Sequence, residues 1–190
     1  MATPKSQRIG ILIIAAVMLI GTFGSFMAII FSMQNSSSSA SDSQAYEDYL
    51  KEQKIAAQLN ADNSEALTGY ETRTFDADKA ETLSVEVLKN GDGEQVESTD
   101  SVKVSYFGWT SDGKIFDSSK KKGADDAPIS FALSDVISGW SEGLAGVKAG
   151  SIVRLTIPAD KAYGALGSGI IPANAPLEFI VQVHEIVTEV

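Results

Sequence analysis

The feature that most constrains the fold is an alternation of apolar and polar residues that recurs in four segments after Leu67. These segments are residues 83–87, 102–106, 153–157 and 177–183. Successive side chains of a β-strand point to opposite faces of a sheet, so a period of two places the apolar residues on one face. The pattern therefore predicts antiparallel strands with one face on a core. Glycine-containing turns that use positive φ are predicted at 90–93 and 111–114.

One segment departs from this alternation and indicates a short helix. Ile137, Trp140 and Leu144 are spaced three and four residues apart, which places them on one helical face. Ser138 is the predicted N-cap and Gly146 the predicted stop. Several strands with one short helix predict an α+β domain over residues 67–190, in which a twisted antiparallel sheet wraps around the helix.

The N-terminal part of the sequence predicts a membrane anchor. Residues 9–31 contain no charged side chain, and as a helix they span the roughly 30 Å of a bilayer's hydrocarbon core. Lys5 and Arg8 precede them, and the next basic residue is Lys51. The positive-inside rule then predicts a cytoplasmic stub (1–8), a single transmembrane helix (9–31) and an extracytoplasmic C-terminal domain at the cell membrane. The alternative is a signal peptide cleaved near residues 38–40.

A linker is expected between the membrane segment and the domain, over residues 32–66. Residues 32–43 are dominated by serine and predict a flexible tether. Residues 46–61 have helical character, including the pair Glu47 and Lys51 at i,i+4. We favour a solvated helical spacer over a partner-binding or self-associating helix.

Composition excludes several classes of function. The 190 residues include no cysteine and one histidine, His184, so thiol catalysis and histidine-rich metal sites are excluded. His184 lies on the polar side of its strand and is expected to be exposed. The formal net charge of −10 argues against nucleic acid as a partner, because phosphates would be repelled. Lys120, Lys121 and Lys122 are expected at a solvated loop tip.

Aromatic and aliphatic residues recur among tight glycine turns in the second half of the chain. They form short motifs in a fixed order: Val104-Ser105-Tyr106-Phe107-Gly108-Trp109, Asp112-Gly113-Lys114-Ile115-Phe116-Asp117-Ser118-Ser119, Pro128-Ile129-Ser130-Phe131, Val136-Ile137-Ser138-Gly139-Trp140, Ile157-Pro158, Ala162-Tyr163-Gly164, Ile170-Ile171-Pro172-Ala173-Asn174 and Leu177-Glu178-Phe179. In this order and spacing, over about residues 83–186, the chain resembles the FKBP-type peptidyl-prolyl cis–trans isomerases. Together with the membrane segment, the small acidic domain favours a bacterial envelope protein.

The resemblance implies a role for each matching residue. Trp140 would form the floor of a substrate pocket, the Tyr163 hydroxyl and the Ile137 backbone N–H would donate hydrogen bonds to substrate carbonyls, and Asp117 would be a polar group at the rim. The implied catalytic residues are Tyr106, Phe116, Asp117, Trp140, Tyr163 and Phe179, and the implied substrate-binding residues are Phe131, Val136, Ile137 and Ile171. The family uses no cofactor and no metal. Its implied ligands are proline-containing unfolded or secreted polypeptides and macrolide inhibitors.

The residue types suit this chemistry. Rotation about an X-Pro bond meets a barrier of about 18–20 kcal/mol because resonance gives the C–N bond partial double-bond character. An apolar aromatic pocket disfavours the charge-separated planar amide and binds the twisted amide better, which lowers the barrier without proton transfer.

Three departures from the family pattern leave substrate preference and macrolide affinity open. Ile129 stands where a second aromatic is common, the segment 133–136 is shorter, and the loop 164–169 lacks an aromatic or histidine. The alternative function is a catalytically weak binding or chaperone module of the same fold, tethered to the membrane. Measured turnover separates the two.

Overall fold

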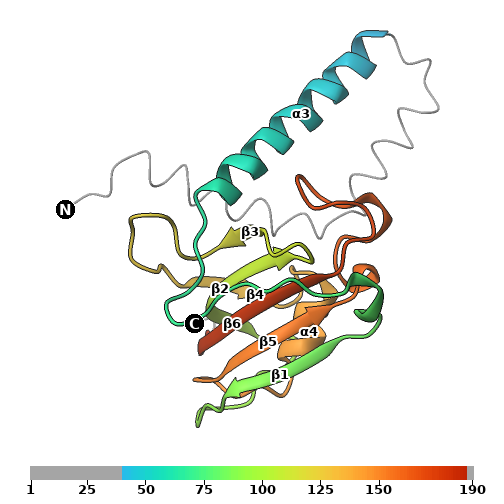
Figure 1. Ribbon diagram of the computed structural model, residues 1–190. Coiled ribbons are helices and arrows are strands. Elements are labelled where there is room, and N and C mark those ends of the chain that lie inside the picture. Colours follow the sequence, from blue (N-terminus) through green and yellow to red (C-terminus); the bar gives the residue numbers. More distant parts are fainter. Residues whose placement is uncertain (1–39, 188–190) are drawn as a thin grey trace.

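The computed structural model describes residues 40–187, with side chains from residue 47 onward. A long helix precedes a compact sheet, and a second, short helix lies against that sheet (Figure 1). The elements are α3 (Ala40–Asp62), η1 (Ala77–Lys79), β1 (Ser84–Lys89), β2 (Ser101–Thr110), β3 (Ile115–Ser118), β4 (Ile129–Ala132), α4 (Ser138–Leu144), β5 (Ile152–Ile157), η2 (Ala159–Lys161), η3 (Gly164–Leu166) and β6 (Leu177–Val187).

The strands form one antiparallel sheet in the order β1-β5-β6-β2-β3, with β4 also paired to β2. β6 is the middle strand of this order and pairs with β2 from Ser101 to Thr110. The other edge of β2 is shared, since β4 pairs with residues 101–104 and β3 with residues 107–109. The predicted antiparallel sheet with one short helix is confirmed.

The inner face of the sheet carries the main core. Period-two residues of β2, β5 and β6 are fully buried there and pack with Trp140 and Leu144 of α4. These strand residues are Val102, Val104, Tyr106, Val153, Leu155, Ile157, Leu177, Phe179, Val181 and Val183. Three of the four predicted strands therefore bury the predicted face.

The fourth predicted strand differs. Val85 and Val87 of β1 are 40% and 48% exposed. Leu83, which lies just before the strand, packs against the core instead. Among the strands of residues 40–187, β1 pairs with β5 alone and forms an edge of the sheet. An alternating pattern does not distinguish an edge strand from a central one, so the prediction that these valines are buried was wrong.

Two local predictions also need correction. The N-cap position of α4 is Ile137, and Ser138 is the first helical residue. The helix does end as expected, since Ala145 is the C-cap and Gly146 follows with φ +83°. Gly113 has the positive φ expected of its turn, whereas Gly91 is needed for close approach, because a Cβ there would lie 2.1 Å from the Ala149 carbonyl oxygen.

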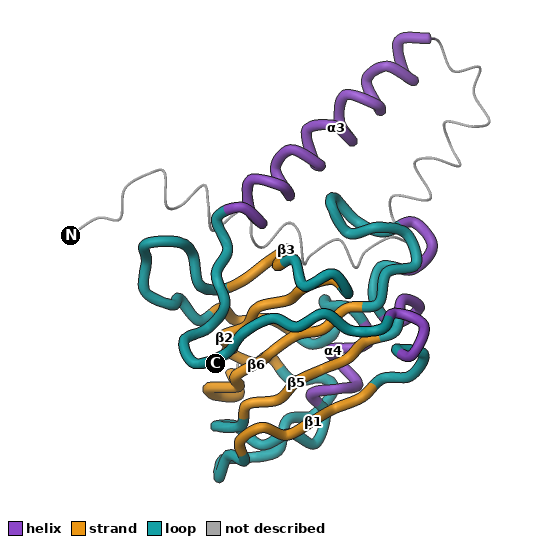
Figure 2. Tube along the Cα trace, viewed as in Figure 1, coloured by secondary structure: helices purple, strands orange, loops and turns teal. Residues whose placement is uncertain are grey.

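The outer face of the sheet carries a second core that the sequence analysis did not predict. We call residues 63–80 the strap, because this segment crosses that face between α3 and β1 (Figure 2). Leu67 of the strap packs with Phe107 and Trp109 of β2 and with Ile152 and Ile180. Polar contacts fix it, since the Trp109 indole N–H donates to the Arg73 carbonyl oxygen at 2.9 Å and the Arg73 guanidinium pairs with buried Glu178. The sheet is therefore covered on both faces.

The helix predicted at 46–61 is confirmed and is longer than expected. α3 begins at Ala40, within the predicted tether, and its last turns contact β3. The predicted membrane segment, residues 9–31, lies outside the described residues. Among the helices of residues 40–187, none is long and apolar enough to cross a membrane.

Candidate active site

The structure brings the predicted site residues together from five strands and helices and the loops beside them. Nine of the ten lie in the inner core cluster: Tyr106, Phe116, Phe131, Val136, Ile137, Trp140, Tyr163, Ile171 and Phe179. The tenth, Asp117, contacts the cluster through a hydrogen bond from Tyr106. Because β2, β3, β4, β6 and α4 each supply one aromatic ring, the cluster depends on the complete sheet. The roles of these residues in catalysis stay predictions.

Trp140 lies at the centre of the aromatic cluster. Its ring packs edge-to-face against Tyr106, Phe131 and Phe179, with centroid distances of 5.3, 5.8 and 5.4 Å. The side chain is fully buried, yet its indole N–H has no hydrogen-bond partner among the described residues. A buried donor without a partner costs about 1–3 kcal/mol, and such a group calls for a physical explanation. A bound ligand that accepts this hydrogen bond or shields the ring would supply one.

The cluster has two layers, distinguished by exposure. Tyr106, Trp140 and Phe179 are 0% exposed, whereas six others retain between 4% and 9%. These six are Phe116, Phe131, Val136, Ile137, Tyr163 and Ile171. The second layer reaches the surface, so the cluster has an apolar side that a ligand can contact.

Two hydrogen-bond donors in this second layer are unengaged. Within residues 47–187, neither the Tyr163 hydroxyl nor the Ile137 backbone N–H has a hydrogen-bond partner. Burial, together with the negative charge of Asp117, raises the pKa of Tyr163 above its ordinary value of 10. The phenol therefore keeps its proton and remains a donor throughout the physiological pH range.

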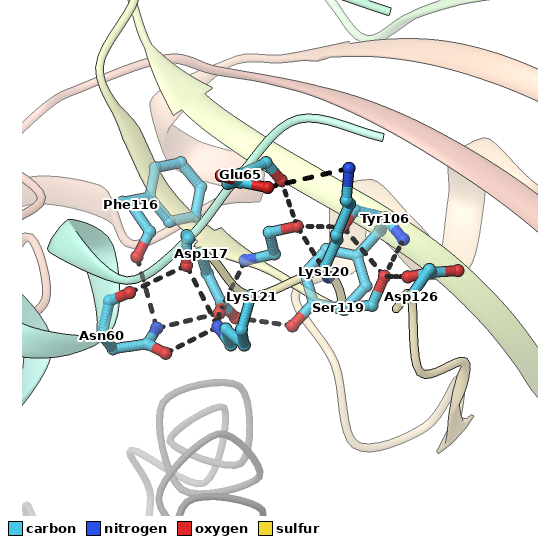
Figure 3. A network of polar contacts seen from close by, with 11 residues as sticks. Asn60, Glu65, Tyr106, Phe116, Asp117, Ser119, Lys120, Lys121 and Asp126 are labelled. Carbon is cyan, nitrogen blue, oxygen red and sulfur yellow. Dashed lines mark hydrogen bonds and ion pairs between the residues drawn. The ribbon is translucent and has the colours of Figure 1, made fainter. Parts of the chain in front are cut away.

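Asp117 does not occupy the rim position predicted for it. It is 0% exposed, and its Oδ2 accepts from the Tyr106 hydroxyl at 2.5 Å. Its Oδ1 accepts from Asn60 Nδ2 and the Ser118 backbone N–H, both at 2.8 Å, and from Lys121 Nζ at 3.3 Å (Figure 3). Within residues 47–187, Oδ1 therefore has three donors and Oδ2 has one. The rim prediction was wrong because donors from α3 and from the loop after β3 cover this carboxylate.

The covering residues were not found from the sequence. Asn60 and Ser64, at the end of α3 and just after it, are 9% and 6% exposed. Lys121, expected at a solvated loop tip, has a 16% exposed side chain and donates to Asn60 Oδ1 at 2.7 Å and Ser64 Oγ at 3.0 Å. Burial lowers the pKa of Lys121, and the charge of Asp117 opposes that change. Buried residues at 57, 60 and 64 have helical spacing, but small and polar residues give little signal in a hydrophobic pattern.

His184 is exposed, as expected. Its Nε2 lies 2.7 Å from Ser105 Oγ on β2, on the outer side of the sheet from the aromatic cluster. It therefore has no place in the site.

This arrangement suits the binding of apolar matter that carries carbonyl groups. The surface-reaching layer is aromatic and aliphatic, and the unengaged polar groups in it are donors. Asp117, the carboxylate in contact with the cluster, is occupied by four hydrogen bonds. A tertiary amide has carbonyl acceptors and no N–H donor, so it matches both properties.

Comparison with known proteins gives relatives of one kind. The family model described as FKBP-type peptidyl-prolyl cis-trans isomerase matches residues 92–184. An FK506-binding protein of Neisseria meningitidis is 37% identical over 106 residues, which cover 55% of this chain and 96% of that protein. The FKBP-type isomerase FkpA of Escherichia coli K12 is 41% identical over 104 residues, 55% of this chain but 37% of FkpA.

The chain thus spans well under half the length of the first curated relatives that it matches. Among solved structures, a peptidyl-prolyl isomerase from Pseudomonas syringae pv. tomato superposes with a TM-score of 0.51 at 27% identity, covering 80% of this chain and all of that one. The Neisseria relative is matched over nearly its whole length at 37% identity. The chain therefore belongs to the FKBP-type peptidyl-prolyl cis–trans isomerase family.

Proposed function

We propose that this chain is a peptidyl-prolyl cis–trans isomerase whose site is the aromatic cluster around Trp140. The observation that carries the proposal is the pairing of an apolar, slightly exposed layer with two unengaged donors, Tyr163 and Ile137. Family membership and isomerase relatives support it.

The mechanism follows from the difference between the planar and the twisted amide. The planar X-Pro amide carries partial charges on oxygen and nitrogen, and an apolar surface solvates them poorly. Twisting removes the resonance and with it much of that charge separation. The surface-reaching layer with Phe116 and Phe131, which has Trp140 packed beneath it, therefore favours the twisted form relative to the planar one. Tyr163 and Ile137 would hold the neighbouring carbonyls, so that the substrate rotates about one bond while the rest stays fixed.

The test is an isomerisation assay on detergent-solubilised full-length protein. Exchange between the cis and trans forms of an X-Pro tetrapeptide is measured by NMR, with Phe116→Ala and Tyr163→Phe as variants. We expect acceleration in the wild type and a strong loss in Phe116→Ala, because its ring reaches the surface at the cluster. A folded wild-type protein that leaves the thermal rate unchanged would refute the proposal.

One observation favours a second candidate, a peptide-binding module with weak turnover. Asp117, which the family resemblance places at the rim of the pocket, is buried and accepts four hydrogen bonds from the chain's own donors. If the wild type binds proline peptides and suppresses aggregation of an unfolded client without accelerating isomerisation, this candidate replaces the first.

We also propose that the domain works outside the cytoplasm on newly secreted, proline-containing chains, tethered by residues 9–31. The charge distribution around that uncharged stretch supports this, as does a long helix, α3, between it and the domain. Protease treatment of spheroplasts carrying a C-terminally tagged chain tests it. Digestion of the tag in intact spheroplasts, with a cytoplasmic marker preserved, is expected; a protected tag that becomes sensitive after lysis would refute the topology.

A further inference from the structure

We propose that Asn60 is a positioning residue of the isomerase site, and that the last turns of α3 are thereby part of that site. This inference rests on the proposed function above. It concerns a residue outside the part of the chain matched by the family model, which begins at residue 92.

α3 contacts the domain through a narrow face of small and polar residues. Gln53, Ala56, Ala57 and Asn60 are half-buried or buried, whereas Ile55 and Leu59 are 53% and 65% exposed. The spacing of three and four places the first four on one side of the helix. Small side chains allow close approach, and a Cβ built on Gly169 would lie 2.7 Å from the Ala57 Cβ. The helix end thus touches the loop that leads to Ile171 as well as β3.

Asn60 is the polar contact in this face. Its Nδ2 donates to Asp117 Oδ1 at 2.8 Å and, with a longer contact, to the Phe116 carbonyl oxygen at 3.4 Å. Its Oδ1 accepts from Lys121 Nζ at 2.7 Å. One side chain therefore holds two consecutive residues of β3 and the ammonium group that neutralises the carboxylate (Figure 3).

The arrangement of donors on Asp117 gives Asn60 its effect on the cluster. Within residues 47–187, three donors, from Asn60, Ser118 and Lys121, are on Oδ1, and the Tyr106 hydroxyl is the single donor on Oδ2. The donors on Oδ1 fix the rotation of the carboxylate and so aim Oδ2 at Tyr106. The Tyr106 ring in turn packs on Trp140 at 5.3 Å. Asn60 thus reaches Trp140 through two intermediates, Asp117 and Tyr106.

Two substitutions separate positioning from simple support. Asn60→Leu keeps the size of the side chain and removes both hydrogen-bonding groups. Asn60→Asp keeps the shape and the acceptor for Lys121, but it replaces the donor to Asp117 with a second carboxylate. Two carboxylates at hydrogen-bonding distance repel, which raises the pKa of one of them, and a proton shared between them restores a donor at low pH. Leu59→Ala, on the exposed side of the same turn, is the matched control.

The assay is NMR exchange on a capped X-Pro peptide without titratable groups, with full-length protein between pH 5 and 8. For Asn60→Leu we expect kcat to fall about tenfold at every pH, with KM within about twofold of wild type, because a misplaced site loses transition-state binding. For Asn60→Asp we expect the same loss at pH 8 and recovery toward wild type at pH 5. Leu59→Ala should match wild type. Activity of Asn60→Leu within twofold of wild type, or an Asn60→Asp loss that does not depend on pH, would overturn the proposal.

A second readout does not depend on turnover. The indole ¹H–¹⁵N cross-peak of Trp140, assigned with Trp109→Phe, should shift in Asn60→Leu and stay in place in Leu59→Ala. If the wild type shows no isomerisation, the proposed function fails, and this cross-peak still tests the connection from Asn60 to Trp140. An unchanged Trp140 cross-peak in folded Asn60→Leu overturns the proposed link from Asn60 to Trp140. If Asn60→Leu does not fold, the pH dependence of activity in Asn60→Asp tests the proposal instead.

Discussion

Tyr106 and Tyr163 are both buried tyrosines in the aromatic cluster. We predict that removing the Tyr106 hydroxyl lowers the stability of the fold, whereas removing the Tyr163 hydroxyl lowers activity. The Tyr106 hydroxyl donates to Asp117 Oδ2 at 2.5 Å with both groups 0% exposed, whereas the Tyr163 hydroxyl has no partner within residues 47–187. A hydrogen bond to a charged group contributes about 1.5–3 kcal/mol. Since Oδ2 has no second donor in the described chain, Tyr106→Phe should cost the upper part of that range, about 2–3 kcal/mol.

Tyr163→Phe, in contrast, should change the free energy of unfolding by less than about 0.5 kcal/mol, because no bond is lost. It should lower kcat/KM about fivefold, which corresponds to a neutral hydrogen bond to substrate of about 1 kcal/mol. Urea denaturation measures the first quantity, and the expected midpoint shift for Tyr106→Phe is about 1–2 M. Isomerisation of an X-Pro tetrapeptide measures the second. Equal destabilisation by the two substitutions would refute the assignment of Tyr163 as an unengaged donor.

Three further predictions concern stability. Arg73→Met should lower the free energy of unfolding by about 2 kcal/mol in chemical denaturation, because Glu178 is 1% exposed and, within the described residues, would keep only the side-chain hydrogen bond from Thr156. The arginine is half-exposed, so the cost is smaller than for a fully buried ion pair. An unchanged free energy of unfolding would show that water replaces the guanidinium. The raised pKa of Tyr163 contributes stability that is fully present below about pH 10 and is lost above it by about 1.4 kcal/mol per pH unit. The free energy of unfolding of Tyr163→Phe should therefore fall less steeply above pH 10 than that of the wild type, by this amount. Equal slopes for the two proteins would contradict the prediction. Gly169→Ala should weaken the packing of α3 on the domain, because Gly169 has φ +55° and a Cβ at this position would overlap Ala57. We expect faster hydrogen exchange of the backbone amides at the end of α3. Unchanged exchange would count against the contact between Gly169 and Ala57.

The part of the fold that could be predicted from the sequence is the part built on regular periodicity. The buried faces of β2, β5 and β6 follow from alternation, and nine of the ten residues chosen from motifs in a fixed order lie together in the inner core cluster. Alternation reports which residues are apolar, and it carries no information on where a strand lies in the sheet. Val85 and Val87 were therefore predicted as core residues although β1 is an edge.

The strap and the end of α3 could not be predicted for a different reason. Leu67 and Arg73 contact residues more than a hundred positions along the chain, and no local pattern announces such pairings. Asn60 and Lys121 look like solvated side chains in sequence because polar residues are usually exposed. The burial of Asp117 depends on both of them, so its predicted place at the rim was wrong as well.

The central pairing of β2 with β6 has a consequence for the order in which the domain can form. Tyr106 pairs with Val181 and Gly108 with Phe179, so β2 finds its main partner only after almost the whole domain has been synthesised. Contacts between residues so distant in sequence slow folding and delay it until the last strand is available. A nascent chain that stops before Leu177 would thus lack β6, the strand that joins β5 to β2, and would carry Trp140 and most of the cluster on an incomplete sheet. Such a chain should depend on folding catalysts, the class of protein to which the finished chain is proposed to belong.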